Sequence, residues 1–360
     1  MVKIKFDIEN IVLAVFLTIL FFIGPGALFN HSIKHDYPYN YLSSDAFHHQ
    51  VRAEAIKDAG NFRYEANYIS KGFDSVVGRY PPLIYHLSAV FSYASGIETY
   101  DSIYFLVYFF VIIGVFVVYL LIRNFNKNVA LISLPLTIIA FTLPPSIGFI
   151  YGHWPSLLGQ FFLIVFAWWI MNSELENTYI PLSVILTSII LSHTSETVFA
   201  FIFLLIFFII KSINRNIKKT EIKNIVIGIL ISFLLSVYYI IIFLNTWAKS
   251  ESYSFAVEPI WQGNPGFYIL GFGALLMFIA TGILFSIIKL KESRAVVIFA
   301  LAMLLSGFLN YIGFGLRSFQ LRFFWPIYLS VFFGFGAYML LKFIIKKWSM
   351  TYSAVISVAL

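Results

Sequence analysis

The segment SDAFHHQVRAEAIKDAG (residues 44–60) is a strongly polar stretch in a chain that is otherwise rich in apolar residues. A serine before Asp45 and a glycine at position 60 are typical helix boundaries, and they predict a helix over residues 45–59. In that helix four polar side chains recur at i, i+3, i+4 and i+7 and share one face: Asp45, His48, His49 and Arg52.

This polar face has two possible meanings. Phe47, Val51 and Ala55 lie largely on another face of the same helix, which favours a helix lying on the outer membrane surface. On the first interpretation the polar face is turned to water and has no further role. On the second it lines a site where chemistry takes place, and Asp45 in the first turn stays ionised because the helix dipole favours a carboxylate there.

The composition indicates an integral membrane protein. Of the 360 residues, 60% are hydrophobic and 11% are charged, whereas a soluble domain carries about 25% charged residues. Apolar runs recur along nearly the whole chain, and a membrane β-barrel would instead show short alternating segments of about 10 residues. We therefore predict an all-α polytopic membrane protein, a bundle of about 10 transmembrane helices of roughly 20 residues each. The absence of cysteine excludes disulfides and thiolate metal sites.

The apolar runs predict a single transmembrane domain over residues 1–360. The run at residues 10–29 lacks a small-residue cleavage site and is predicted to be a retained span. Residues 30–100 follow as a large first extracytoplasmic loop that contains interfacial helices. Further spans are expected at about residues 102–122, 129–149, 157–172, 179–192, 197–211, 224–246, 267–288, 295–314 and 323–341. The final run TYSAVISVAL is either a short tail or the start of a region beyond Leu360.

The distribution of basic residues predicts the topology. With the N-terminus in the cytoplasm, 15 of the 24 lysines and arginines fall on short cytoplasmic segments, as the positive-inside rule requires. The net charge of +7 is therefore mostly topological, and we expect no nucleic-acid partner. We predict a multi-pass protein of the cell membrane.

Several further polar clusters fall on the predicted outer side. Tyr80 precedes two prolines, and a short loop carries a histidine before Trp154. Each of these has a structural interpretation, as a rigid loop exit or a solvated side chain. Ionisable residues near the membrane usually face a cavity, and basic residues beside aromatic ones suit a lipid phosphate or serve as membrane anchors. Candidate substrate-binding residues in these clusters are Tyr80, His153, His193, Glu196, Arg317 and Arg322.

The segments SDAFHHQVRAEAIKDAG and GRYPPLIYHLSAVFSYASG (residues 78–96) resemble the first outer loop of the GT-C superfamily of membrane glycosyltransferases, which includes the oligosaccharyltransferase catalytic subunits. The later segment YGHWPSLLG (residues 151–159) and the histidine of LSHTSE (residues 191–196) are similar to features of its prokaryotic members. The resemblance covers residues 1–210 by motif, and the rest only by its pattern of spans.

The resemblance implies transfer of a sugar from a polyprenyl-phosphate-linked donor to a glycan, lipid or protein acceptor at the outer face. By analogy Asp45 is the catalytic residue, as a general base or as a ligand, with His49, of a divalent Mg or Mn ion. His48, His49 and Arg52 would line the site, and Arg317 with Arg322 would hold the donor phosphate. Two departures argue against peptide glycosylation: the chain has no WWD sequence, and the second-loop acidic pair is missing where His153 stands.

A function of another class remains open. A transporter or flippase of a lipid-linked or anionic solute would use the same outer arginines, together with His193 and Glu196. Transporters usually show inverted repeats and broken helices. The chain has no convincing internal repeat, and its large outer loop has no counterpart in the second half.

Overall fold

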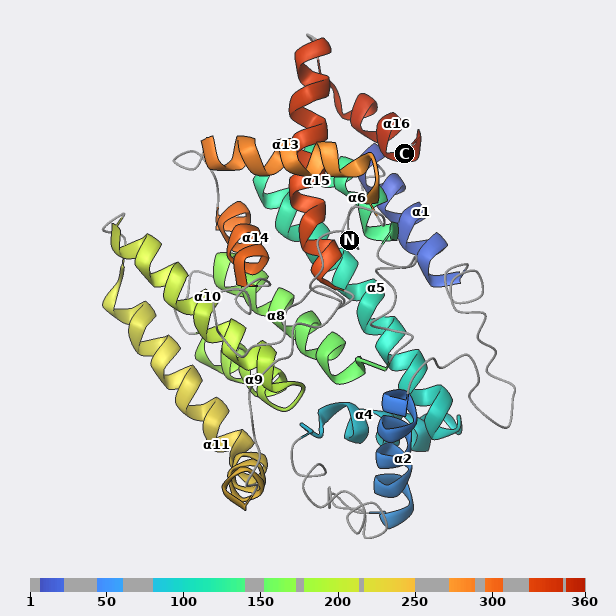
Figure 1. Ribbon diagram of the computed structural model, residues 1–360, viewed down its shortest axis with the longest axis vertical. Helices are drawn as coiled ribbons and strands as arrows, with labels where there is room; N and C mark the ends of the chain where they lie inside the picture. Colours follow the sequence, from blue (N-terminus) through green and yellow to red (C-terminus); the bar gives the residue numbers. More distant parts are fainter. Residues whose placement is uncertain are drawn as a thin grey trace, which may run out of the picture.

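A computed structural model describes residues 7–22, 44–60, 80–139, 152–172, 178–213, 217–249, 272–288, 295–306, 324–345 and 348–359. Nearly all of these residues are helical (Figure 1), and none of them lies in a β-strand. The all-α prediction is therefore confirmed. The first helices are α1 (Ile8–Phe22), α2 (Ser44–Ala59), α4 (Leu83–Ser95), α5 (Thr99–Phe125), α6 (Lys127–Ile139) and α8 (Trp154–Asn172). They are followed by α9 (Tyr179–Ile190), α10 (Thr194–Ile213), α11 (Lys219–Lys249), α13 (Leu275–Ile288), α14 (Ala295–Ser306), α15 (Phe324–Ile344) and α16 (Met350–Ala359).

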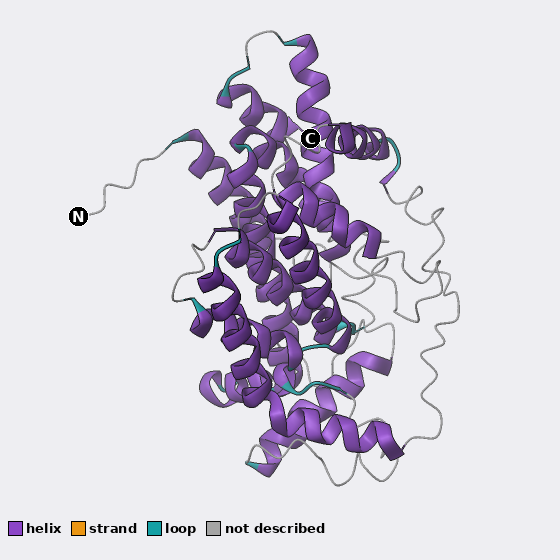
Figure 2. Ribbon diagram, turned by 90° about the vertical axis from the view of Figure 1, so that its left-hand side faces the viewer, coloured by secondary structure: helices purple, strands orange, loops and turns teal. Residues whose placement is uncertain are grey.

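The helices have the length and composition of membrane spans. Among the described residues, α5, α8, α10 and α11 are each long and apolar enough to cross a bilayer, and several shorter apolar helices accompany them. Figure 2 shows that helices make up the described part of the molecule from one end of its long axis to the other. Helices suit this environment because each satisfies its backbone hydrogen bonds internally.

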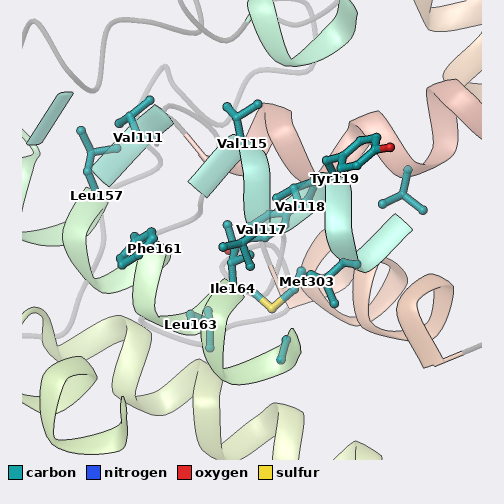
Figure 3. Close-up of a cluster of buried hydrophobic side chains, with 14 of the residues drawn as sticks. Val111, Val115, Val117, Val118, Tyr119, Leu157, Phe161, Leu163, Ile164 and Met303 are labelled. Carbon is teal, nitrogen blue, oxygen red and sulfur yellow. The ribbon is translucent and has the colours of Figure 1, made fainter. Parts of the chain in front are cut away.

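The centre of the bundle is the packing of α5 against α8. Val111, Val115 and Val118 of α5 face the same cluster as Phe161 of α8 and Met303 of α14 (Figure 3), and all five are buried. The β-branched valines are stiff at χ1 and lose little freedom when they pack. This core holds the helices that carry the polar residues in fixed positions.

Two glycines let α13 and α15 cross closely. A Cβ atom on Gly282 would overlap the carbonyl oxygen of Phe332, and one on Gly336 would overlap that of Phe278. Helices in a membrane associate through such close approach of small residues, because lipid provides no hydrophobic driving force. Gly282 of α13 and Gly336 of α15 are thus required by the packing.

The two ends of α5 lie beside different ion pairs. At the end where α5 finishes, the buried carboxylate of Glu9 accepts a hydrogen bond from Tyr119 at 2.7 Å and pairs with Arg123 and Lys127. At the opposite end lie α2 and α4 (Figure 1), and Lys57 of α2 lies 3.8 Å from Glu98 just before α5. Helices α2 and α4, which belong to the predicted outer loop, and the basic cluster of Arg123 and Lys127 therefore lie at opposite ends of α5.

Candidate functional site

Helix α2 turns its polar face into the protein. It begins at Ser44 and ends before Gly60, which has a φ of 60°, in the left-handed region that glycine adopts without strain. His49 is 2% exposed and Arg52 is 3% exposed, whereas Val51 is 39% exposed. The interpretation in which these polar side chains face water is therefore wrong. The reason is that α2 packs with this face against α4 and the start of α5.

His49 sits in an aromatic cage. Its Nδ1 atom shares a hydrogen bond of 2.8 Å with the hydroxyl of Tyr85, and the rings of Tyr80, Tyr85 and Trp154 have centroids 5.4, 5.7 and 6.2 Å from its own. Burial holds the pKa of His49 well below its usual value, and the positive charge of Arg52 and the nearby histidines His153, His48 and His193 lower it further. His49 is therefore neutral at pH 7, when it offers one donor and one acceptor.

Arg52 lies beside His49 in the same cage. Its guanidinium carbon is 4.8 Å from the ring centre of Tyr80 and 6.0 Å from that of Tyr85, which is within the range of cation–π attraction. Its Nη1 atom donates to the backbone oxygen of His48 at 3.2 Å. No described residue forms a hydrogen bond with the buried Nε atom.

A backbone hydrogen bond brings a third segment to this end of the bundle. The helix α4 starts after Pro82, and the amide of Leu83 donates to the carbonyl oxygen of Leu191 at 2.9 Å. Leu191 belongs to the short turn between α9 and α10. The loop with Tyr80 and the turn with His193 are thereby tied together, although more than 100 residues separate them.

Helices α8 and α10 meet at a buried carboxylate. Glu196 is fully buried; its Oε2 pairs with Nδ1 of His193, and its Oε1 accepts hydrogen bonds from Ser156 at 3.0 Å and Gln160 at 3.3 Å. The other ring nitrogen of His193 forms no hydrogen bond with any described residue. Gly159 permits this contact, because a Cβ atom there would lie 3.2 Å from both Glu196 and His193. A carboxylate that holds one nitrogen of an imidazole fixes the ring's orientation.

The structure brings most of the predicted site residues together. The described ones at this end are His48, His49, Arg52, Tyr80, His153, His193 and Glu196. Asp45 lies in the first turn of α2, and its side chain is outside the described part of the structure. Arg317 and Arg322 also lie outside the described residues, so their roles stay predictions.

Sequence reasoning missed four residues that contact this site. Tyr85 and Trp154 form the cage around His49, and Ser156 and Gln160 hold Glu196. Ser156 and Gln160 are four residues apart on one face of an apolar helix, and that pattern is a usable signal for a polar contact.

The described part of the chain does not by itself form a metal site. It contains no group of three or more histidine, aspartate or glutamate side chains that could hold an ion. His49 shares its Nδ1 atom with Tyr85, and the cation of Arg52 lies beside it. A metal ion at this position would depend on Asp45.

Comparisons with known proteins identify the fold. No protein-family model and no curated protein sequence matches this chain. Solved structures of the Archaeoglobus fulgidus oligosaccharyltransferase are similar to it. The apo form has a TM-score of 0.57 at 13% identity over the whole of this chain, and the complex with zinc and sulfate has a TM-score of 0.59 at 14% identity over 98% of it.

The matches cover 55% and 51% of the archaeal enzyme, so this chain spans about half of its length. The identity is low, and the likeness concerns the arrangement of helices. It agrees with the resemblance that the motifs in residues 44–60 and 78–96 predict. The chain therefore shares the helical fold of this archaeal oligosaccharyltransferase over the part that it covers.

Proposed function

We propose that this protein is a glycosyltransferase that moves a sugar from a polyprenyl-phosphate or polyprenyl-diphosphate donor to an acceptor at the outer face of the membrane. One observation carries the proposal. Four segments far apart in sequence, namely α2, the loop at Tyr80, the start of α8 and the turn before α10, gather histidines, an arginine and a carboxylate at one end of the bundle. The GT-C-like fold supports the same conclusion.

Glycosyl transfer needs a base that takes the acceptor proton and positive charge that stabilises the leaving phosphate. In the transfer, the bond from sugar C1 to the donor phosphate breaks, and a bond from C1 to the acceptor oxygen or nitrogen forms. The acceptor proton passes to a general base, which we assign to Asp45. The acceptor is a glycan, a lipid or a protein.

A divalent ion belongs to this proposal only through Asp45. The archaeal enzyme of similar fold was solved in complex with zinc and sulfate. In this chain the described side chains do not form a metal site on their own, so we derive no step through an ion. Asp45 and His49 are one helical turn apart on α2, the spacing at which two side chains of a helix meet.

The proposal also includes an orientation in the cell membrane. The end with α2 and α4 would face outward, and the end with Arg123 and Lys127 would face the cytoplasm, as the positive-inside rule favours. The donor would then enter from the outer leaflet.

The test uses purified protein in proteoliposomes with a panel of radiolabelled polyprenyl-phosphate sugars. Loss of label from the lipid fraction measures transfer. We expect Asp45→Asn to lower the rate by about 100-fold or more, the typical loss on removal of a general base. Asp58→Asn, an exposed aspartate of the same helix, is the matched control and should leave the rate unchanged.

Two results would contradict the proposal. Full activity of the Asp45→Asn variant would remove Asp45 from the catalytic step. If the labelled lipid crosses the bilayer intact and no donor is consumed, the protein is a transporter or flippase.

A further inference from the structure

Arg52 is a buried cation whose counter-charge is missing from the described structure. Arg52 is 3% exposed, and among the described residues its Nε atom has no hydrogen-bond partner and no carboxylate forms an ion pair with it. The partners that it does have are one backbone carbonyl and the rings of Tyr80 and Tyr85. By contrast, the basic residues at the other end, Arg123 and Lys127, both pair with Glu9.

Such an arrangement is costly for the protein alone. A buried N–H group without an acceptor destabilises the folded protein, and a buried charge without a partner destabilises it more. Cation–π contacts offset only part of this cost. A binding group that awaits its ligand commonly carries a stability cost of this kind.

We propose that Arg52 binds the phosphate of the lipid-linked donor. This inference rests on the proposed function and assigns to Arg52 the anion contact of that same site. Guanidinium matches phosphate because its planar fork donates two parallel hydrogen bonds, one of them from an atom such as the unpartnered Nε.

The surroundings suit a phosphate better than a second cation. Arg52 supplies positive charge to the cage, so the cage attracts an anion and repels a second cation, while His49 stays neutral at pH 7. The hydroxyl of Tyr85 is also in the cage. Packing of the guanidinium on Tyr80 fixes its plane, which reduces the entropy lost when the fork binds two oxygens.

The experiment measures binding to the full chain purified in detergent. The probes are undecaprenyl phosphate, undecaprenol without the phosphate, and inorganic pyrophosphate. The variants are Arg52→Gln, Arg52→Lys and the control Lys57→Gln, which removes a more exposed positive charge from the same helix. We expect Arg52→Gln to weaken undecaprenyl phosphate binding about tenfold or more, Arg52→Lys to weaken it less, and Lys57→Gln to leave it unchanged. Undecaprenol binding should not respond to any of the three.

The outcomes separate this inference from the proposed function. Equal binding of undecaprenyl phosphate by wild type and Arg52→Gln overturns the role of Arg52 and leaves the proposed function standing. If wild type binds pyrophosphate but no undecaprenyl phosphate, and Arg52→Gln loses the pyrophosphate, the anion site stands and the lipid-linked donor fails. If wild type binds neither undecaprenyl phosphate nor pyrophosphate, the role of Arg52 and the proposed function are both overturned.

The unfolding temperature without ligand gives a second, independent readout. Because the chain supplies no described counter-charge, Arg52→Gln should unfold at the same temperature as wild type or higher. Failure of this variant to fold, or a large fall in its Tm, would mean that Arg52 has a structural partner, and it would overturn the inference.

Discussion

At the scale of single residues, the polar groups of this protein are divided into two kinds. Glu196 is fully paired, with His193, Ser156 and Gln160 around its two oxygens. Arg52 has no carboxylate partner among the described residues. A satisfied buried network stiffens the structure, whereas an unsatisfied buried polar group is uncommon and needs an explanation. We propose that the first kind positions the site and that the second kind recognises its substrate.

The pKa of His49 leads to a prediction about stability. Its pKa in the folded protein is depressed, mainly by burial, while in the unfolded chain it is near the usual value of about 6.5. Below that pH the unfolded chain binds a proton that the folded protein does not bind, so stability falls as pH falls. We expect the Tm of wild type to drop between pH 7.5 and 5.5.

The His49→Asn variant should lose part of this pH dependence, because asparagine does not titrate. His48→Asn, one position earlier and less buried, is the control and should keep it. If wild type and His49→Asn show the same fall in Tm, His49 is not the group responsible.

At the scale of elements, the crossing of α13 and α15 depends on backbone contact. Gly336 has no room for a Cβ atom, because the obstacle is the backbone oxygen of Phe278. Gly228 of α11 is also close to its neighbour, yet there the obstacle is the side chain of Leu182. A side chain can change rotamer, whereas a helix backbone moves only as a unit.

We therefore predict that Gly336→Ala destabilises the protein by about 1–3 kcal/mol or more, the usual cost of overpacking. Gly228→Ala is the matched control and should cost less. Thermal unfolding in detergent measures the Tm of both variants and of wild type. A Tm of Gly336→Ala equal to that of wild type would show that α13 can shift away from α15 at no cost.

At the scale of the whole molecule, the polar site and the basic cluster lie at opposite ends of α5. Removing the exposed positive charge of Lys127 should not change ligand binding at the α2 end. The reason is that the Debye length in physiological salt is about 8 Å, so exposed charges act only over short distances. The placement of the lysines and arginines is the basis for the proposed orientation of the two ends in the membrane.

The lack of native cysteine makes this orientation testable without background labelling. We predict that a single cysteine at Asp58, exposed at the α2 end, reacts with a membrane-impermeant maleimide in intact cells. A single cysteine at Asn124, exposed near the end of α5, should react only after the membrane is permeabilised. The reverse labelling pattern would invert the proposed topology.

The sequence alone determined the class of the protein and the sites of its helices. A 60% hydrophobic chain with long apolar runs must form helices in a membrane, since no other open structure satisfies its backbone there. The runs predicted at residues 102–122 and 157–172 correspond to α5 and α8. The spacing of His48, His49 and Arg52 likewise required a shared helical face.

Only the tertiary structure decided which way that face points. In a membrane protein an apolar helix face can contact lipid as readily as protein, so amphipathic spacing defines a face but not its direction. Val51 is therefore exposed while Arg52 is buried. The partners of Glu196 were also beyond sequence reasoning, because Ser156 lies 40 residues away on another helix, and only the packing of α8 against α10 brings the two side chains within hydrogen-bonding distance.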